Sequence, residues 1–252
     1  MHRSSHFDFI IIGNGLAGLQ LALKLSTEIS FHEKTIALID PSKKTTNDKT
    51  WSFWETEPSQ WKALTHKTWS KASIITSNKE IHLNLDPYTY KTIRAIDFYT
   101  EAKAQLKQKD NIYFIEEHVT SVTENSQVTV KTSTKTFTTT HAFDSRVPEE
   151  FIIEPKNSIS IIQHFKGWVI KTERDIFDEN KVIMMDYRLK DGHQTTFTYV
   201  LPFSKTEALV EFTYFTENTV KDRVYDDYIK TYIKDYLKIE SYSIIETEAG
   251  QI

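Results

Sequence analysis

Three of the six glycines in this chain of 252 residues fall within six positions, in the segment Gly13-Asn-Gly15-Leu-Ala-Gly18. The residues before it, 7–12, are almost all apolar and predict a short buried strand. The residues after it, from 16 to about 26, carry leucine and alanine at helical spacing. A chain this poor in glycine uses it where the backbone must turn tightly or approach a ligand closely. The pattern therefore predicts a strand, a tight glycine loop and a helix.

A second strand, predicted over residues 35–39, ends in Asp40, which follows Gly18 by 22 residues. In dinucleotide-binding βαβ units, the acid that binds the adenosine ribose lies about 20 residues further on. In such a unit Gly13 allows the turn, Gly15 admits a pyrophosphate, and Gly18 lets helix and strand pack closely. The helix N-terminus offers free N–H groups to the phosphates. We therefore predict that Gly13, Gly15, Gly18 and Asp40 bind a dinucleotide; the alternative is a glycine-rich turn without a ligand.

The composition excludes several classes of protein. A net charge of −4 provides no basic surface for a nucleic acid. The absence of cysteine excludes disulfides and thiol catalysis and agrees with a reducing compartment, so we expect a cytoplasmic protein. The nine histidines show no metal-ligand spacing, so no metal is expected. The N-terminus has no apolar signal segment, and no run approaches the roughly 18 apolar residues of a membrane-spanning helix.

The order of the expected elements indicates the fold class. A polar loop over residues 41–50 leads into the aromatic cluster Trp51-Ser-Phe-Trp54, which has no helical or strand pattern. Helices are predicted over about 95–109 and 220–237, and strands near 72–75, 81–85, 112–115, 119–122, 127–131, 135–146, 160–165, 168–172, 182–188, 195–201 and 208–215. A βαβ unit, an interrupted return of strands and a late antiparallel block are typical of two-domain flavoproteins.

We therefore expect an α/β protein with a Rossmann-like FAD/NAD(P)-binding domain over residues 1–146, into which strands are inserted. An antiparallel β-rich substrate domain should follow over residues 147–252, together with the start of a return to the first domain. A short-chain dehydrogenase would continue its βαβ units without interruption, so a plain NAD(P)-dependent dehydrogenase is disfavoured.

Seven separated motifs lie in order along the chain, and the resemblance that they carry extends over essentially all of it. They are residues 8–22, Asn47-Asp-Lys-Thr-Trp51-Ser-Phe-Trp54, Phe143-Asp-Ser-Arg146, Gln163-His-Phe-Lys-Gly-Trp168, Met185-Asp-Tyr-Arg188, residues 197–204 and Ala208-Leu-Val-Glu211-Phe-Thr213. The first is shared by many flavoproteins, but the later set resembles the FAD-dependent lycopene cyclases of bacterial type, which form the β-ionone rings of β-carotene. The resemblance ends inside the motif Glu246-Thr-Glu248-Ala-Gly250-Gln-Ile252, so we expect a chain truncated at its C-terminus.

The resemblance implies the activity and the ligands. Lycopene cyclisation is an isomerisation without net redox change, in which reduced FAD is the active cofactor and NAD(P)H the reductant. Lycopene resides in the bilayer, so a peripheral attachment to the membrane surface is expected. The missing C-terminal part would carry a second flavin-contacting segment and helices.

Glu211 is our candidate for the acid. It is the only charged residue in the apolar strand predicted over residues 208–215. The terminal alkene of lycopene is a very weak base, so its proton donor must be a carboxylic acid that a water-poor, apolar pocket keeps neutral. The resemblance identifies this position with the family's catalytic carboxylate. The sequence by itself favours a solvent-facing strand glutamate.

Other candidates keep two interpretations. One interpretation of Glu246 and Glu248 is that they provide a second acid or orient the flavin. The other is that they form a pair on the surface of a strand. Trp51, Phe53 and Trp54 are core residues or rings that stabilise a cation. Arg146, beside Asp144, lines the cofactor or forms a turn ion pair.

Two rival functions share this fold. A flavin monooxygenase would need oxygen for turnover, and a prenyl-lipid-binding protein would have lost the flavin. The intact glycine fingerprint argues against the second.

Overall fold

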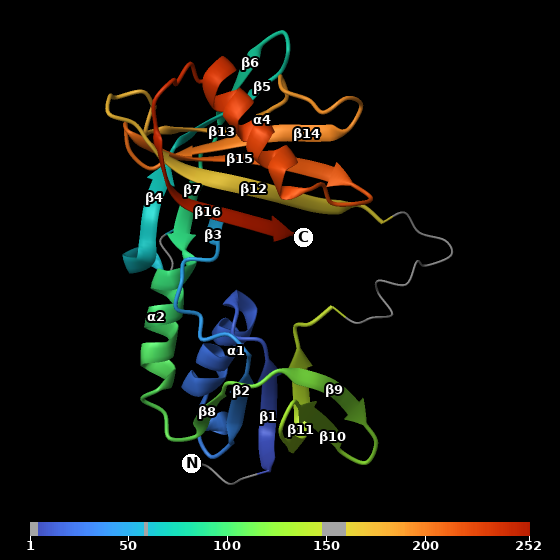
Figure 1. Cartoon of the computed structure of the whole chain (residues 1–252). Helices are drawn as coiled ribbons and strands as arrows, with labels where there is room; N and C mark the ends of the chain where they lie inside the picture. The colour runs from blue at the N-terminus through green and yellow to red at the C-terminus, as the bar shows by residue number, and fades with distance from the viewer. Residues whose placement is uncertain (1–4, 58–59, 148–159) are drawn as a thin grey trace. The chain divides into compact units, whose positions relative to one another are not determined.

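The computed structural model describes residues 5–57, 60–147 and 160–252, which form two compact units (Figure 1). The described residues up to Asp48 and from Ala95 to Val147 make the first unit. Those from Lys49 to Arg94 and from Ser160 onward make the second. This division differs from the expected split at residue 146, because residues 49–94 leave the first unit and pair with strands of the second.

The first unit is a six-stranded sheet with two main helices. Its elements are β1 (His6–Ile12), α1 (Leu16–Thr27), the 3-10 turn η1 (Ile29–Phe31), β2 (Ile36–Ile39), α2 (Ala95–Leu106), β8 (Ile112–Ile115), β9 (Val119–Glu124), β10 (Val128–Thr132) and β11 (Thr136–Asp144). The strand order is β8-β2-β1-β11-β10-β9; the first four strands are parallel, and β10 and β9 continue antiparallel. The carboxyl ends of β1, β2 and β11 therefore meet at one edge of the sheet.

Burial of apolar residues accounts for this arrangement. β2 is buried along its whole length, as expected of a parallel strand covered on both faces. The two helices α1 and α2 pack against each other, and each presents alanine and large apolar side chains to the interior. A separate cluster centred on Phe7, Ile10 and Ile12 fills the other part of the core. The expected strand–helix–strand unit at the N-terminus is confirmed.

The second unit contains a seven-stranded and a three-stranded sheet. Its elements are β3 (Thr50–Glu55), the 3-10 turn η2 (Lys62–Leu64), β4 (Thr65–Trp69), β5 (Lys71–Ile75), β6 (Glu80–Asn84), β7 (Thr89–Arg94), β12 (Ile162–Lys171), β13 (Lys181–Asp186), β14 (Thr195–Pro202), β15 (Glu207–Thr216), α4 (Asp222–Asp235) and β16 (Ser243–Gln251). The strand orders are β16-β12-β15-β14-β13-β5-β6 and β3-β7-β4. The expected antiparallel block is confirmed, with one parallel contact between β13 and β5.

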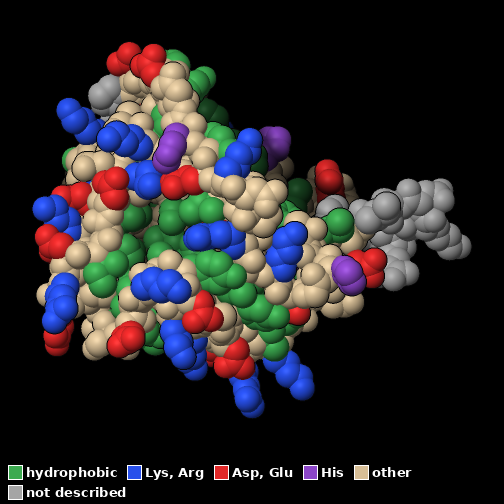
Figure 2. Space-filling model, turned by 90° about the horizontal axis from the view of Figure 1, so that it is seen from above, with side chains coloured by type: hydrophobic (Ala, Val, Ile, Leu, Met, Phe, Trp, Pro, Cys, Tyr) green, Lys and Arg blue, Asp and Glu red, His purple; other side chains and the backbone are tan. Residues whose placement is uncertain are grey.

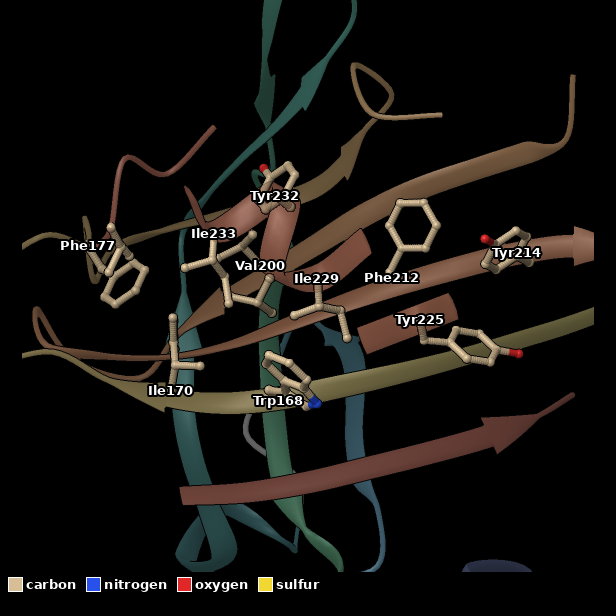
Figure 3. Packing of buried hydrophobic residues seen from close by; sticks show 13 residues of the cluster. Trp168, Ile170, Phe177, Val200, Phe212, Tyr214, Tyr225, Ile229, Tyr232 and Ile233 are labelled. Atoms are coloured by element: carbon tan, nitrogen blue, oxygen red, sulfur yellow. The ribbon is translucent and has the colours of Figure 1, made fainter. Parts of the chain in front are cut away.

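The two faces of the large sheet are covered differently. Figure 3 shows the cluster of buried hydrophobic residues that α4 and the strands below it form together, in which Phe212, Tyr214 and Tyr232 are fully buried. On the opposite face, Trp69 and Tyr90 of the small sheet pack against Leu209 and its neighbours. Since successive strand residues point to opposite faces, Phe212 belongs to the α4 face and its neighbour Glu211 to the face near the small sheet.

Three local expectations differ from the structure. The aromatic cluster at Trp51–Trp54 is not a loop but part of β3, where it pairs with β7. The two strands expected over 160–165 and 168–172 are one strand, β12, which runs through Gly167. Strands β4 and β7 were not expected at all.

Candidate functional site

The glycine loop lies between β1 and α1, and its backbone requires glycine at two positions. Gly13 has φ of 105°, a conformation that side chains disfavour, and a Cβ there would lie 2.2 Å from the Oγ of Ser145. A Cβ on Gly18 would lie 2.0 Å from the carbonyl oxygen of Gly13. Both glycines are therefore needed for the turn itself and for the close approach of α1.

Gly15 has a different role. A Cβ on it would have no atom within 4 Å, so the protein leaves open space beside this residue. Gly15 is the N-cap of α1, and no side chain caps the free N–H groups of the first turn. Next to it, the buried Oδ1 of Asn14 has no hydrogen-bond partner within the described residues. An open loop, free amides and an orphaned polar atom suit a ligand that carries phosphates and hydrogen-bond donors.

Asp40 lies at the carboxyl end of β2, next to this loop. Its carboxylate accepts hydrogen bonds of 2.7 Å from the backbone amides of Asn14 and Ser42. The carboxylate is buried and borders a cavity of about 740 Å³. The expected neighbourhood of the glycine loop and an acid is thus present, and the acid also holds the loop in place.

The cavity beside Asp40 carries positive charge. Four lysines contribute to its lining, two after β2, one from α2 and one directly after α2: Lys43, Lys44, Lys103 and Lys107. Burial, together with the neighbouring charges of Lys107 and Lys44, lowers the pKa of Lys103. Such surroundings favour an anionic ligand that would offset the crowded ammonium groups.

Arg146 lies after β11, and its guanidinium group pairs with the carboxylate of Asp144. The two side chains form an ion pair of 2.7 Å, and Arg146 also donates to the carbonyl oxygen of Val119 at 2.8 Å. Burial opposes ionisation of Asp144, but the hydrogen bonds and charge of Arg146 lower its pKa. The ion pair in the turn, which was one of the two interpretations of Arg146, is therefore present. A role of Arg146 in cofactor binding stays a prediction.

A row of paired residues that includes Glu211 and Glu248 crosses the large sheet of the second unit. Glu211 on β15 pairs with Gly167 on β12 and with Tyr199 on β14, and Gly167 in turn pairs with Glu248 on β16. Directly paired residues point to the same face, so this row reads Glu248, Gly167, Glu211, Tyr199. Because Gly167 has no side chain, the side chains of Leu209 and Glu211 pack closely over it. A Cβ there would lie 2.9 Å from Leu209 and 3.3 Å from the Cβ of Glu211.

Glu211 is strongly perturbed. Burial of the carboxylate, and then the charge of Glu248, raises its pKa to about 8. The Thr213 hydroxyl donates to it at 2.9 Å and Lys49 lies within electrostatic range, but both lower the pKa by less. A carboxyl group with this pKa is protonated at neutral pH, which the sequence by itself did not favour.

Glu248 has more partners that favour its ionised form. The Thr50 hydroxyl donates to its Oε2 at 2.6 Å. Lys49 donates to the neighbouring carbonyl of Ala249 at 2.7 Å and adds positive charge. Burial raises the pKa of Glu248, and Thr50 and Lys49 lower it again in part. Glu246, two residues away, forms an ion pair of 2.6 Å with Arg94.

Hydroxyl and aromatic groups complete the row. The Tyr199 hydroxyl hydrogen-bonds that of Tyr90 at 2.5 Å, and the ring of Trp54 lies 4.5 Å from the ring of Tyr90. Burial raises the pKa of both tyrosines. Trp51 and Phe53 alternate with Trp54 along β3 and therefore point to the other face of the small sheet. Of the three expected rings, only Trp54 shares the face of Tyr90.

Sequence reasoning did not single out Gly167, Tyr199, Tyr90, Lys49 or Thr50. Gly167, Lys49, Thr50 and Tyr199 stood inside motifs that were recognised as wholes. Their meaning depends on strand register, because Thr50 meets Glu248 across 198 residues. The tyrosines carried no local signal that separated them from ordinary strand residues.

Among the described residues, no helix is both long and apolar enough to cross a membrane. Within the same ranges, no group of three or more acidic or histidine side chains could hold a metal ion.

The fold, a Rossmann-like unit with its glycine loop and a β-rich second unit, is one that solved flavoproteins share. The family model for lycopene cyclase protein matches residues 8–252, so the chain belongs to the lycopene cyclase family. No curated protein sequence matches the chain.

Solved structures share the fold at low sequence identity. A geranylgeranyl bacteriochlorophyll reductase-like protein from Thermoplasma acidophilum is 11% identical with a TM-score of 0.71, over 99% of this chain and 66% of that one. The flavin-dependent brominase Bmp2 is 12% identical with a TM-score of 0.65, over 98% and 67%. Halogenase PltM, solved in complex with phloroglucinol and FAD, is 10% identical with a TM-score of 0.67, over 97% and 59%. The chain thus spans about two thirds or less of the length of these proteins.

Proposed function

We propose that this chain provides the dinucleotide site and the acid of a lycopene β-cyclase, which converts the open ψ-ends of lycopene to β-ionone rings without net redox change. Family membership supports the substrate class. The observation that carries the reaction type is Glu211, a carboxyl group in desolvated surroundings, beside a second carboxylate and facing apolar side chains. Such a group holds a proton at neutral pH and can give it to a weak base.

The reaction needs a proton donor and protection from water. Glu211 gives its proton to C2 of the terminal C1=C2 bond, which leaves a cation at C1. The C5=C6 electron pair then forms the C1–C6 bond, and loss of the proton from C6 completes the β-ring. The apolar side chains packed around Trp69 and Leu209 would help to exclude water that could otherwise quench the cation to an alcohol. Trp54 and the tyrosines offer π density nearby.

FAD is the proposed cofactor, and NAD(P)H its reductant. The residues of the glycine loop fit a dinucleotide, since Gly15 is open and the buried Oδ1 of Asn14 lacks a partner. Gly13, Gly15 and Gly18 would admit the pyrophosphate at the N-terminus of α1, and Asp40 would hold the ribose. Reduced flavin would supply negative charge that stabilises a carbocation.

The direct test is pigment formation by the complete natural protein in lycopene-accumulating cells. Wild type should produce monocyclic and bicyclic β-ring carotenes and carry FAD. Glu211→Gln keeps shape and polarity but loses the acidic proton, so it should bind FAD normally and accumulate lycopene. A product that contains oxygen and forms only in air would replace this function with that of a flavin monooxygenase. Normal β-carotene production by Glu211→Gln would remove Glu211 as the acid.

We further propose that the protein works in the cytoplasm, attached peripherally to a membrane from which it draws lycopene. Figure 2 shows one face on which hydrophobic side chains gather among charged side chains, aspartate and glutamate as well as lysine and arginine, an amphipathic surface that would suit attachment to a lipid surface. Co-sedimentation of the complete protein with anionic and neutral vesicles tests this. Full activity on dispersed lycopene without lipid or detergent, and no sedimentation with either vesicle, would contradict it.

A further inference from the structure

The row across the large sheet contains two carboxyl groups whose surroundings differ. Glu211 receives one hydroxyl hydrogen bond, from Thr213 on its own strand. Glu248 receives a shorter one, 2.6 Å, from Thr50 on another strand. Lys49, which precedes Thr50, donates to the carbonyl oxygen of the residue after Glu248 and so fixes a positive charge beside it. The environment therefore favours a proton on Glu211 and a negative charge on Glu248.

The geometry lets both groups act on one ring. The strands that carry Glu211 and Glu248 are two spacings apart, about 10 Å, with β12 between them. Gly167 on that middle strand has no side chain, so the two carboxyl groups can converge over it. In the proposed cyclisation, the proton enters at C2 and leaves from C6, and both carbons are bonded to C1. An acid and a base that stand on the same face, on either side of Gly167, match this requirement.

We propose that Glu248 is the base that removes the C6 proton, and that Thr50 is the residue that positions it. This inference rests on the proposed function. Glu211 transfers its proton to C2, and the C1–C6 bond forms, leaving the cation at C5. Glu248 takes the C6 proton, and the C6–H electron pair becomes the C5=C6 double bond. The cycle closes when the proton returns from Glu248 to Glu211 across Gly167, so no proton, electron or atom is gained or lost.

The assignment also makes Glu248 a determinant of the ring type. The same C5 cation gives a β-ring when it loses the C6 proton and an ε-ring when it loses a C4 proton. A carboxylate fixed by Thr50 can reach only the carbon that faces it. Other charged and titratable groups of this region are engaged elsewhere: Glu246 with Arg94, and Tyr199 with Tyr90.

The test uses the complete natural protein with reduced FAD and lycopene that carries deuterium at C6. Glu248→Gln should lower kcat about a hundredfold or more with little change in KM. Its C6 deuterium isotope effect on kcat should exceed that of wild type, and the residual product should include ε-rings. Thr50→Val removes the hydroxyl and should lower kcat about tenfold with the same change in isotope effect, whereas Thr50→Ser should restore both. Glu207→Gln, the same chemical change at the end of β15, is the matched control and should behave like wild type.

Each outcome decides the assignment. If Glu248→Gln and Thr50→Val keep the kcat, isotope effect and ring type of wild type, Glu248 is not the base. If Glu248→Gln fails to fold, as judged by its thermal unfolding, the comparison of Thr50→Val with Thr50→Ser decides whether Glu248 is the base. A loss of kcat in Thr50→Val that Thr50→Ser does not restore, without any change in isotope effect, also overturns it. If wild type with reduced FAD forms no carotene ring, the proposed function fails and this assignment falls with it.

Discussion

The backbone amide of Asn14 donates a hydrogen bond of 2.7 Å to the carboxylate of Asp40, so the acid after the second strand holds the loop after the first. A second amide, that of Ser42, donates to the other carboxylate oxygen. The glycine loop and the acid thus form one unit before any ligand arrives. Asp40 has a structural role in addition to its proposed role at the ribose.

Replacing Asp40 should therefore affect more than ribose binding. Asp40→Ala removes both acceptors, so the amides of Asn14 and Ser42 lose their partners, and we expect the unfolding free energy of the first unit to fall by about 1–3 kcal/mol. Asp40→Asn keeps one acceptor oxygen and should cost less. Denaturant unfolding and flavin content of the complete protein measure the two effects. Unchanged stability in Asp40→Ala would show that the two amide bonds contribute little.

The glycines of the loop should separate folding from ligand binding. Gly15→Ala places a methyl group in open space, so it should leave stability nearly unchanged and still abolish FAD retention. Gly18→Ala forces a methyl group against the carbonyl oxygen of Gly13 and should destabilise the first unit by about 1–3 kcal/mol or more. Circular dichroism melts and the flavin absorbance of the purified proteins check this. Full flavin retention in Gly15→Ala would contradict the proposed phosphate site.

Local patterns were sufficient for the first unit as far as Asp40. The buried strand, the helix and the second strand are each specified by residues close together in sequence, and the three glycines mark the loop. What local patterns could not show is that the chain leaves this unit after Asp48 and returns at Ala95. That excursion depends on pairing of β5 with β13, residues more than a hundred positions apart.

The second site was predictable only in part. Glu211 stood out as a lone charge in an apolar strand, and its raised pKa in the structure agrees with the chemistry expected of an acid. Strand β3 was missed because Trp54 directly follows Phe53 and breaks the alternation of apolar and polar residues that indicates a strand. The convergence of Thr50, Gly167 and Glu248 depends on register across three distant segments, which one sequence does not encode locally.

The hydroxyl pair of Tyr90 and Tyr199 should behave as a coupled unit. Each single change to phenylalanine leaves the other buried hydroxyl without this partner, so each should cost about 1–3 kcal/mol of unfolding free energy. The double variant should cost less than the sum of the two, because no orphaned hydroxyl remains. Urea unfolding of the four proteins in a double-mutant cycle measures the coupling. Additive costs would show that the hydroxyls do not interact.

The raised pKa of Glu211 predicts how stability depends on pH. Because the folded protein binds this proton up to about pH 8, whereas an unfolded glutamate releases it near pH 4.5, the side chain destabilises the fold increasingly over that interval. The free energy of unfolding is therefore unaffected by this titration below pH 4.5, and it falls as the pH rises from 4.5 to about 8. Glu211→Gln does not titrate, so its stability advantage over wild type should grow by about 3–5 kcal/mol between pH 4.5 and pH 8 and then level off.

The same titration should appear in catalysis. Turnover by the complete protein should decline as the pH rises through about 8, when Glu211 loses its proton. We expect urea unfolding at several pH values to measure the stability effect in wild type and Glu211→Gln, with Glu207→Gln as the control. The kcat of the complete protein over the same pH range measures the effect on turnover. Parallel stability profiles for wild type and Glu211→Gln would mean that this carboxyl group titrates normally. The acid at the centre of the proposed reaction would then have to be sought elsewhere.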